Sequence, residues 1–264
     1  MMKNYQIQAV SAFEDNYIWL IHDDTQAIII DPGSSQEVLD YLNRHQLIAS
    51  AILVTHHHDD HTGGVRKILN VYKDCALYAH EDHGFKELSF VNLVDEGDEV
   101  GVIGLTFKVW RTAGHTDSHL SYVADIDQKT RVFCGDTLFS AGCGRVFTGT
   151  MAQLFESMRR FNEMDDGVVF YPAHEYTLSN LKFAQSVATD DAQPMIDQVT
   201  QAVKALRQAG KISLPVTLEH ERKINVFLQA CDAQKAKEFA AKHHLAQDTA
   251  LSVFTWLREK KNNF

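Results

Sequence analysis

The stretch Thr55-His56-His57-His58-Asp59-Asp60-His61-Thr62-Gly63-Gly64 decides the fold of this chain. It places four histidines and two carboxylates directly after the apolar run Ala51–Val54. Side chains this polar cannot share a core without partners, because each buried imidazole or carboxylate that lacks a hydrogen bond or a metal costs free energy. A solvent-exposed loop is the simpler alternative, but ligand-type residues crowded behind a strand-like run are typical of a metal site. The stretch therefore predicts a metal centre.

The composition is that of an ordinary globular protein. Its 264 residues are 45% hydrophobic and 23% charged, which suits one large domain or a domain with an appendage. The formal net charge of −10 argues against a nucleic acid partner, because phosphate backbones are bound through clusters of Lys and Arg. An anionic substrate would need a local cationic patch or a metal.

The cysteines and the N-terminus bear on where the protein works. The four cysteines are too few for a disulfide framework and lack the CxxC spacing of structural zinc, so we expect reduced thiols. No apolar run approaches the roughly 20 residues that span a bilayer, and Met1–Gln6 is polar with no apolar stretch behind it. The sequence predicts a cytoplasmic protein with no membrane span, and we expect a monomer.

The sequence pattern changes near residue 175. The first part alternates β-branched and aromatic runs with helical patterns, whereas helical periodicity dominates after Tyr176. The expected strands are 17–21, 27–30, 51–54, 76–79, 105–110, 120–124, 132–134 and 168–171. The expected helices are 38–47, 64–71 and 152–164, followed by 178–188, 195–208, 233–243 and 249–260. The pattern predicts an α+β fold with helices on the outer faces of sheets, as a domain of residues 1–175 and a small helical domain of residues 176–264.

Three further candidate ligands each follow a strand-like run: His115, Asp136 and His174. Strand ends on one edge of a sheet can converge in space, so these side chains are expected to join the opening cluster. The set then contains His56, His58, Asp60, His61, His115, Asp136 and His174. Seven ligands exceed the roughly three protein ligands of one catalytic zinc. The economical arrangement is two metals, roughly 3.5 to 4 Å apart, with a shared carboxylate and a bridging hydroxide.

This ligand pattern resembles that of the metallo-β-lactamase superfamily in its dinuclear hydrolase form. The segments that narrow the resemblance to the glyoxalase II, or hydroxyacylglutathione hydrolase, family are Gly135–Phe139, Ala141–Arg145, Pro172–Tyr176 and Arg258-x-x-Lys261. The resemblance runs along the whole chain. It implies an αββα sandwich followed by a small helical C-terminal domain.

The resemblance also implies a division of the ligands between two divalent ions. His56, His58 and His115 would hold the first ion, Asp60, His61 and His174 the second, and Asp136 would bridge them. Asp60 and Asp136 are thereby expected to be catalytic residues. Zinc is the first expectation, with iron and manganese compatible with the same donors. The ions would lower the pKa of bound water from 15.7 toward about 7, and the resulting hydroxide would attack a thioester carbonyl.

The substrate implied by the resemblance is S-D-lactoylglutathione, cleaved to glutathione and D-lactate in the second step of methylglyoxal detoxification. The residues that match substrate contacts of the family are Arg145, Phe147, Tyr176, Arg258 and Lys261. Arginine can bind a carboxylate through two parallel hydrogen bonds. For Arg258 and Lys261 the alternative is a solvated helix end, where cations complement the helix dipole.

The chain departs from the family pattern at two places. Phe147 stands where relatives have a tyrosine, which removes one hydroxyl from the substrate site. Asn225-Val226-Phe227 stands where the family has Asn-Pro-Phe, which removes a fixed φ angle and is expected to loosen a turn.

Alternative functions remain open at this point. A persulfide dioxygenase of the same superfamily would use one iron and three protein ligands, an RNA-processing nuclease fits the acidic charge poorly, and a metal- or glutathione-binding protein would bind without hydrolysis. Asp31 is interpreted as a turn residue that could also hydrogen-bond a ligand histidine. His119 is expected to be structural or exposed.

Overall fold

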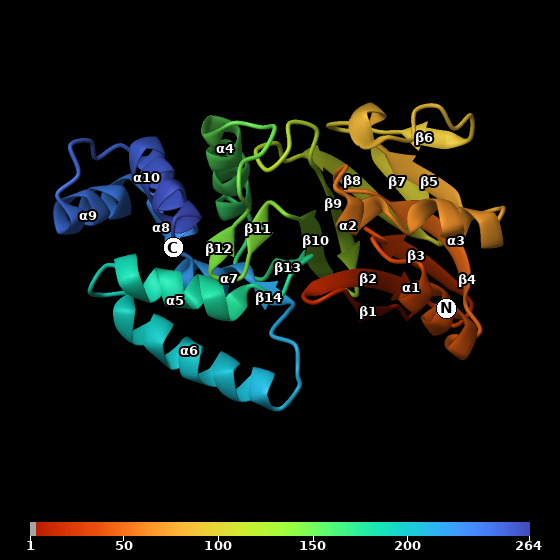
Figure 1. Ribbon diagram of the computed structural model, residues 1–264, viewed down its shortest axis with the longest axis horizontal. Helices are drawn as coiled ribbons and strands as arrows, with labels where there is room; N and C mark the ends of the chain where they lie inside the picture. The colour runs from red at the N-terminus through yellow and green to blue at the C-terminus, as the bar shows by residue number, and fades with distance from the viewer. Residues whose placement is uncertain (1–3) are drawn as a thin grey trace. The chain divides into compact units, whose positions relative to one another are not determined.

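The computed structural model describes residues 4–264 (Figure 1). Contacts within the chain divide it into two compact units. The first unit runs to Thr112 and continues over Ser118–Gly135; the second contains Ala113–Asp117 and Asp136–Phe264. Met1–Lys3, the start of the polar N-terminus from which the cytoplasmic location is predicted, lies outside the described residues. From residue 4 onward, no helix is long and apolar enough to cross a membrane. The predicted division at residue 175 stays a prediction.

The first unit begins with a six-stranded sheet in the order β1-β2-β3-β4-β5-β6. Its strands are β1 (Gln6–Ala12), β2 (Asn16–His22), β3 (Gln26–Ile30), β4 (Ile48–Leu53), β5 (Ala76–Ala79) and β6 (Val91–Leu93). The pairs from β1 to β3 are antiparallel and those from β3 to β6 are parallel. Parallel neighbours need a crossover, which α1 (Gln36–His45) provides before β4 and α2 (Asp59–Thr62) with α3 (Val65–Val71) before β5.

A buried apolar cluster holds α1 and α3 against one face of this sheet. Leu42 of α1 and Ile68 of α3 are fully buried with alternate residues of the strands, such as Ile29 and Ile52. Each such side chain contributes roughly 1.5 to 3 kcal/mol on burial. The rigid sheet therefore fixes the end of β4, where the histidine-rich stretch begins.

The remaining strands of the first unit form antiparallel neighbours in the order β10-β9-β8-β7. They are β7 (Glu99–Val102), β8 (Leu105–Arg111), β9 (Leu120–Ile126) and β10 (Lys129–Gly135). Between β5 and β6 lies the short 3-10 helix η1 (Glu81–His83). The Tyr122 hydroxyl of β9 donates a hydrogen bond of 3.0 Å to the Val54 carbonyl at the end of β4, which ties the two groups of strands together.

The second unit is mostly helical. Its strands are the paired β11 (Leu138–Phe139) and β12 (Gly142–Cys143) and the paired β13 (Val169–Pro172) and β14 (Val216–Thr217). Its helices are α4 (Met151–Asn162), α5 (Thr177–Val187), α6 (Gln193–Gln208), α7 (Leu218–Ile224), α8 (Val226–Ala230), α9 (Ala233–His243) and α10 (Ala250–Asn262). Mixed sheets followed by a helical region confirm the predicted α+β class.

The eight predicted strands and seven predicted helices are all present, with no end shifted by more than three residues. The strand β1 escaped prediction because its weakly apolar residues alternate with polar ones along an edge. The helices α7 and α8 are too short for a periodic pattern. At their junction Asn225 accepts hydrogen bonds from the Phe227 and Leu228 N–H groups, so α8 is capped with Val226 in place of the proline that the resemblance implies.

Candidate metal centre

In the first unit, the histidine-rich stretch leaves β4 and enters α2. His58 precedes α2 in an extended conformation, so Asp60 and His61 lie on the first turn of the helix. Ligand atoms of His56 and His58 lie within 4.8 Å of one another, as do those of Asp60 and His61. His56 and His61 are fully buried. The structure thus brings together, within this unit, the four ligands predicted from the opening stretch.

Asp31, at the end of β3, orients two of these histidines. Its carboxylate accepts hydrogen bonds from the Thr55 N–H and the Thr55 hydroxyl, both at 2.7 Å, and lies 3.1 Å from His61 Nδ1. Because a carboxylate only accepts, His61 Nδ1 carries the proton and Nε2 presents its lone pair. Because the Thr55 hydroxyl donates its proton to Asp31, it can only accept a hydrogen bond from His56 Nδ1, which lies 3.1 Å away. His56 Nδ1 therefore carries the proton, and Nε2 is the atom that could bind a metal. The hydrogen bond that Asp31 was expected to accept from a histidine of the cluster is confirmed.

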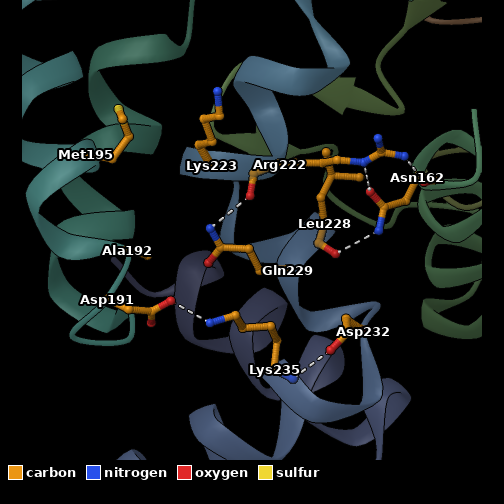
Figure 2. Close-up of a pocket in the computed structure, with 10 residues that line it drawn as sticks. All are labelled: Asn162, Asp191, Ala192, Met195, Arg222, Lys223, Leu228, Gln229, Asp232 and Lys235. Atoms are coloured by element: carbon orange, nitrogen blue, oxygen red, sulfur yellow. Dashed lines mark hydrogen bonds and ion pairs between the residues drawn. The ribbon is translucent and has the colours of Figure 1, made fainter. Parts of the chain in front are cut away.

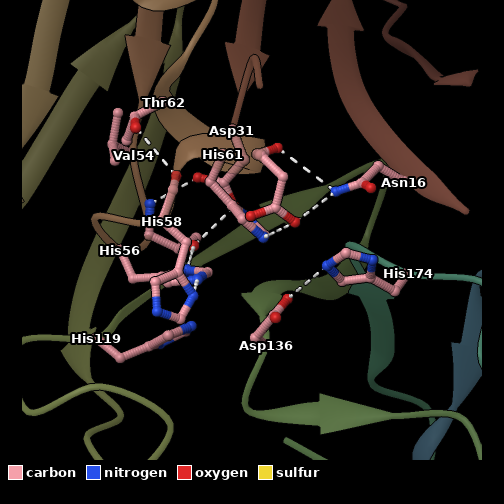
Figure 3. Close-up of polar contacts among 12 residues, drawn as sticks. Asn16, Asp31, Val54, His56, His58, His61, Thr62, His119, Asp136 and His174 are labelled. Carbon is pink, nitrogen blue, oxygen red and sulfur yellow. Dashed lines mark hydrogen bonds and ion pairs between the residues drawn. The ribbon is translucent and has the colours of Figure 1, made fainter. Parts of the chain in front are cut away.

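Two residues that support this half of the ligand set were not predicted. The Asn16 amide, at the start of β2, donates to Asp60 Oδ2 at 2.9 Å. The His119 ring stacks on His56 with centroids 4.9 Å apart, and its Nδ1 lies 3.0 Å from the Thr112 hydroxyl. Figure 3 shows Asn16 and Asp31 pointing toward the α2 stretch from different strands. Neither contact follows from a local motif, because Asn16 and Asp60 are 44 residues apart in the chain.

Gly33 allows the backbone to approach Asp60. A Cβ atom at this position would lie 1.8 Å from the Asp60 carbonyl oxygen, where no side chain can fit. The Ile30-Asp31-Pro32-Gly33 turn therefore lies directly on the ligand loop.

In the second unit, the two oxygens of Asp136 face different imidazoles. His115 Nε2 lies 3.5 Å from Asp136 Oδ2. On the other side, His174 Nε2 lies 3.4 Å from Asp136 Oδ1, as Figure 3 shows. His115 Nδ1 lies 2.7 Å from the Arg145 carbonyl oxygen, so Nδ1 carries the proton and Nε2 is the ligand atom. The Asp136 carboxylate therefore lies between two imidazoles, with each of its oxygens near a different ring.

The donor-atom pairs within each unit have separations that suit coordination of a divalent metal ion. Two ligands of a tetrahedral ion, each at 2.0 to 2.1 Å, are roughly 3.3 Å apart. His56 Nε2 and His58 Nδ1 are 3.0 Å apart, and His61 Nε2 is 3.4 Å from Asp60 Oδ2. The two Asp136 pairs fall at 3.4 and 3.5 Å. Neutral imidazoles and carboxylates suit divalent zinc, iron and manganese.

Aromatic rings line the second-unit ligands. The Tyr176 ring stacks flat on His174 with centroids 4.7 Å apart, and the Phe139 edge meets both rings. The Phe147 ring is 59% exposed, packs edge-on to His115, and lies below the Arg145 guanidinium at 5.9 Å. The exposed Arg145 and Phe147 thus form a cationic and apolar surface beside one ligand.

Arg258 and Lys261 differ in their surroundings although both lie on α10. Arg258 is 5% exposed and donates to the Cys143 carbonyl at 2.8 Å, so the alternative of a solvated helix end is wrong for this residue. Lys261 donates to the Ser179 carbonyl at 3.1 Å, and burial beside the Arg258 cation lowers its pKa to about 8. Only Lys261 keeps the partial exposure expected of a substrate contact.

A separate cavity of about 440 Å³ lies among α4, α6, α7, α8 and the start of α9 (Figure 2). Its charged side chains are bonded to neighbouring residues. Lys235 pairs with Asp191, Lys223 pairs with Glu219, the Asp232 carboxylate caps α9, and Arg222 donates to the Met164 carbonyl just after α4. These contacts hold helices together, so the cavity is a structural junction.

Comparisons with known proteins agree with this geometry. Residues 13–174 match the family described as the metallo-β-lactamase superfamily, and residues 175–264 match the family described as the hydroxyacylglutathione hydrolase C-terminus. Solved structures with the same fold include a metallo-β-lactamase from Staphylococcus aureus and ETHE1 from Myxococcus xanthus. The first has a TM-score of 0.64 and 18% identity over 98% of this chain and 72% of its own. The second has a TM-score of 0.63 and 24% identity over 99% of this chain and 92% of its own.

The fold and the ligand motif together define a member of the metallo-β-lactamase superfamily, which confirms the predicted fold class. Hydroxyacylglutathione hydrolases from Erwinia tasmaniensis and Salmonella arizonae are 41% and 39% identical to this chain, each over 98% of it and 99% of their own length. Within the superfamily, the chain belongs to the hydroxyacylglutathione hydrolase family.

Proposed function

We propose that this protein hydrolyses S-D-lactoylglutathione and related S-2-hydroxyacylglutathiones to glutathione and the free 2-hydroxy acid, the second step of methylglyoxal detoxification. The observation that carries the proposal is the 39 to 41% identity with hydroxyacylglutathione hydrolases over 98% of the chain. The ligand pairs of both units support it, since their tautomers and separations suit divalent metals.

The proposed centre contains two divalent ions, with zinc as the first expectation and iron or manganese as alternatives. One ion would be held by His56, His58 and His115. The other would be held by Asp60, His61 and His174, and Asp136 would bind both ions. Bound there, the ions would supply hydroxide at neutral pH and increase the electrophilicity of the thioester carbonyl. The two-sided contacts of Asp136 support its bridging role.

The chain's own residues would prepare this chemistry in two ways. Asp31 fixes the lone pairs of His61 and, through Thr55, of His56, so both donors point correctly before a metal arrives. Asn16 holds the Asp60 carboxylate in one orientation. Asp60 and Asp136 are the proposed catalytic carboxylates because each combines a ligand atom with a fixed position next to the reacting groups.

The proposed binding of a glutathione thioester rests on the charges of the substrate and of the chain. Glutathione carries carboxylates, and a chain with a net charge of −10 must present cations locally to bind them. Arg145, with Phe147 beneath it, and Lys261 supply such groups, while Tyr176 offers a ring beside His174. Arg258 would act through the Cys143 carbonyl. We propose that residues 176–264 form a substrate-binding domain and residues 1–175 the catalytic domain.

We propose that the protein is a cytoplasmic monomer. It would act on a small molecule and would bind neither nucleic acid nor a membrane. The negative charge and the polar composition support this part of the proposal. Size-exclusion chromatography with light scattering would test the monomer, and a mass of twice 29.8 kDa would contradict it.

The test combines a thioesterase assay with elemental analysis. Protein purified from its own host is expected to contain two metal equivalents and to consume the thioester absorbance of S-D-lactoylglutathione. Absence of turnover by zinc-, iron- and manganese-loaded protein would refute the proposal. One iron per chain with oxygen consumption would favour a persulfide dioxygenase, and tight glutathione binding without hydrolysis would favour a sensor.

A further inference from the structure

A buried carboxylate holds a strained turn in the second unit. The turn joins β11 to β12 and contains Ser140 and Ala141, and Ala141 has a φ of 56°. This left-handed conformation is disfavoured for alanine, so surrounding contacts must maintain it. The contacts come chiefly from Glu221 of α7, which is 80 residues further along the chain.

Glu221 uses both carboxylate oxygens on this turn. The Ser140 hydroxyl donates to Oε1 at 2.7 Å, and the Ala141 N–H donates to Oε2 at 2.7 Å. The Asn225 amide donates to the same Oε2 at 3.0 Å and to the Gly142 carbonyl at 2.9 Å. The carboxylate therefore fixes the backbone and a side chain of the turn at once, while Asn225 fixes the strand that leaves it.

The hairpin held in this way connects the groups that the proposed function requires. It begins after Asp136, the proposed bridging ligand, and ends before Arg145, whose carbonyl orients His115. Between them, the Phe139 ring packs on His174, and the Cys143 carbonyl accepts from Arg258. A shift of the turn would displace metal-side and substrate-side groups together.

We propose that Glu221 is a positioning residue of the thioesterase, which holds the β11–β12 hairpin in the conformation that substrate binding requires. The inference rests on the proposed function for its kinetic consequence. Its structural part, the restraint of the hairpin by one carboxyl group, stands on the contacts alone.

The carboxyl group can keep these contacts in either protonation state. Burial raises its pKa to about 7, and the groups that face it are the neutral Ser140 hydroxyl, Ala141 amide and Asn225 amide. When protonated, Oε1–H can donate to the Ser140 oxygen while Oε2 still accepts from the two amides. Glu221→Gln reproduces this neutral form, with its NH₂ group in place of the acid proton. Glu221→Ala removes every contact.

The sign of the pH dependence follows from the raised pKa. The folded hairpin favours the protonated carboxyl, so the stabilisation it gives is complete below the ordinary pKa of 4.5 and is lost as the pH rises through about 7. Local opening of the hairpin should therefore become easier between pH 6 and pH 8 in the wild type. In Glu221→Gln this change should be absent.

The experiment compares Glu221→Gln and Glu221→Ala with a control of purely structural effect. Phe239→Leu in α9 is that control, because Phe239 is fully buried in a helix without a residue of the hairpin or the proposed site. Each variant is measured for metal content, urea stability, thioester kinetics, and amide hydrogen exchange of the segment 138–144.

We expect Glu221→Ala to raise the KM for S-D-lactoylglutathione about tenfold or more at unchanged metal content, since small displacements of binding groups cost up to about a hundredfold. Glu221→Gln should restore KM to within about threefold of the wild type. Exchange over 138–144 should accelerate at least about tenfold in Glu221→Ala and not in Phe239→Leu. The wild-type to Glu221→Gln exchange ratio should increase from pH 6 to pH 8.

Two outcomes would overturn the inference. The first is a KM in Glu221→Ala that matches that of Phe239→Leu, and the second is an exchange rate over 138–144 in Glu221→Ala that matches that of Phe239→Leu. Failure of the wild type to cleave the thioester would refute the proposed function instead, and the exchange measurements would still decide whether Glu221 restrains the hairpin.

Discussion

The two units orient their candidate metal ligands by different means. In the first unit, the side chain of Asp31 determines the tautomer of His61 directly and that of His56 through Thr55. In the second unit, the backbone carbonyl of Arg145 determines the tautomer of His115. A side chain can be removed by substitution, whereas a carbonyl can be displaced only by moving the chain. Metal binding by the candidate ligands of the first unit, the first half of the site, should therefore be sensitive to point mutations of the supporting residues. Metal binding by those of the second unit, the second half, should be sensitive to changes in backbone conformation.

The largest effect is expected from Asp136→Ala, which removes the group that faces two imidazoles. Loss of a proposed bridging ligand should abolish retention of both metals and reduce kcat/KM by about a thousandfold or more. Asp59→Ala, on the exposed side of the α2 loop, is the matched control and should leave both quantities close to wild type. Elemental analysis and the thioesterase assay check the prediction, and retention of two metals by Asp136→Ala would contradict the bridging role.

The next largest effect is expected from alanine substitutions at two glycines, one in each unit, where an added Cβ atom would collide with backbone. A Cβ at Gly33 would lie 1.8 Å from the Asp60 carbonyl oxygen, and a Cβ at Gly144 would lie 1.9 Å from that of Asp136. Since backbone cannot move aside cheaply, either alanine substitution should cost about 3 kcal/mol of unfolding free energy and most of the activity. Urea denaturation and the assay measure both.

Gly167→Ala is the control for this pair, because a Cβ there meets no atom within 4 Å. It should leave stability within about 0.5 kcal/mol of the wild type. Equal stability of Gly144→Ala and Gly167→Ala would show that the second half tolerates displacement of its backbone, contrary to the comparison.

The same comparison explains which residues of the candidate site could be predicted from the sequence. The seven candidate ligands could be proposed because His56–His61 is a local motif and the other three follow strand-like runs. The supporting contacts were not, because Asn16 reaches Asp60 across 44 residues and Glu221 reaches Ala141 across 80. His119 resembled any structural histidine until the fold placed it against His56. Local chemistry identifies ligands, whereas their orientation depends on tertiary contacts.

Asp31→Ala should have an intermediate effect, confined to the first half. It leaves the Thr55 hydroxyl and His61 Nδ1 without their acceptor, and loss of such an orienting group costs about 10- to 100-fold in metal affinity. Competition with a chelator measures the affinity, with the exposed Asp74→Ala of the same unit as control. An unchanged affinity would mean that the ligand loop orients its histidines without Asp31.

The smallest expected effect concerns Lys261, the partly exposed cation of the second unit. Burial lowers its pKa to about 8, so the fraction that carries a charge declines as the pH passes that value. If the charge binds a glutathione carboxylate, KM should increase by a few-fold between pH 7 and pH 9.5, at little change in kcat. The rate of spontaneous thioester hydrolysis is subtracted at each pH.

Lys261→Arg supplies the matched comparison, because a guanidinium stays charged throughout this range. Its KM should remain flat where that of the wild type rises, while Lys261→Ala should have the raised KM at every pH. A wild-type KM that stays flat to pH 9.5 would assign Lys261 to the α10–α5 contact through the Ser179 carbonyl, and would leave Arg145 as the proposed carboxylate-binding cation.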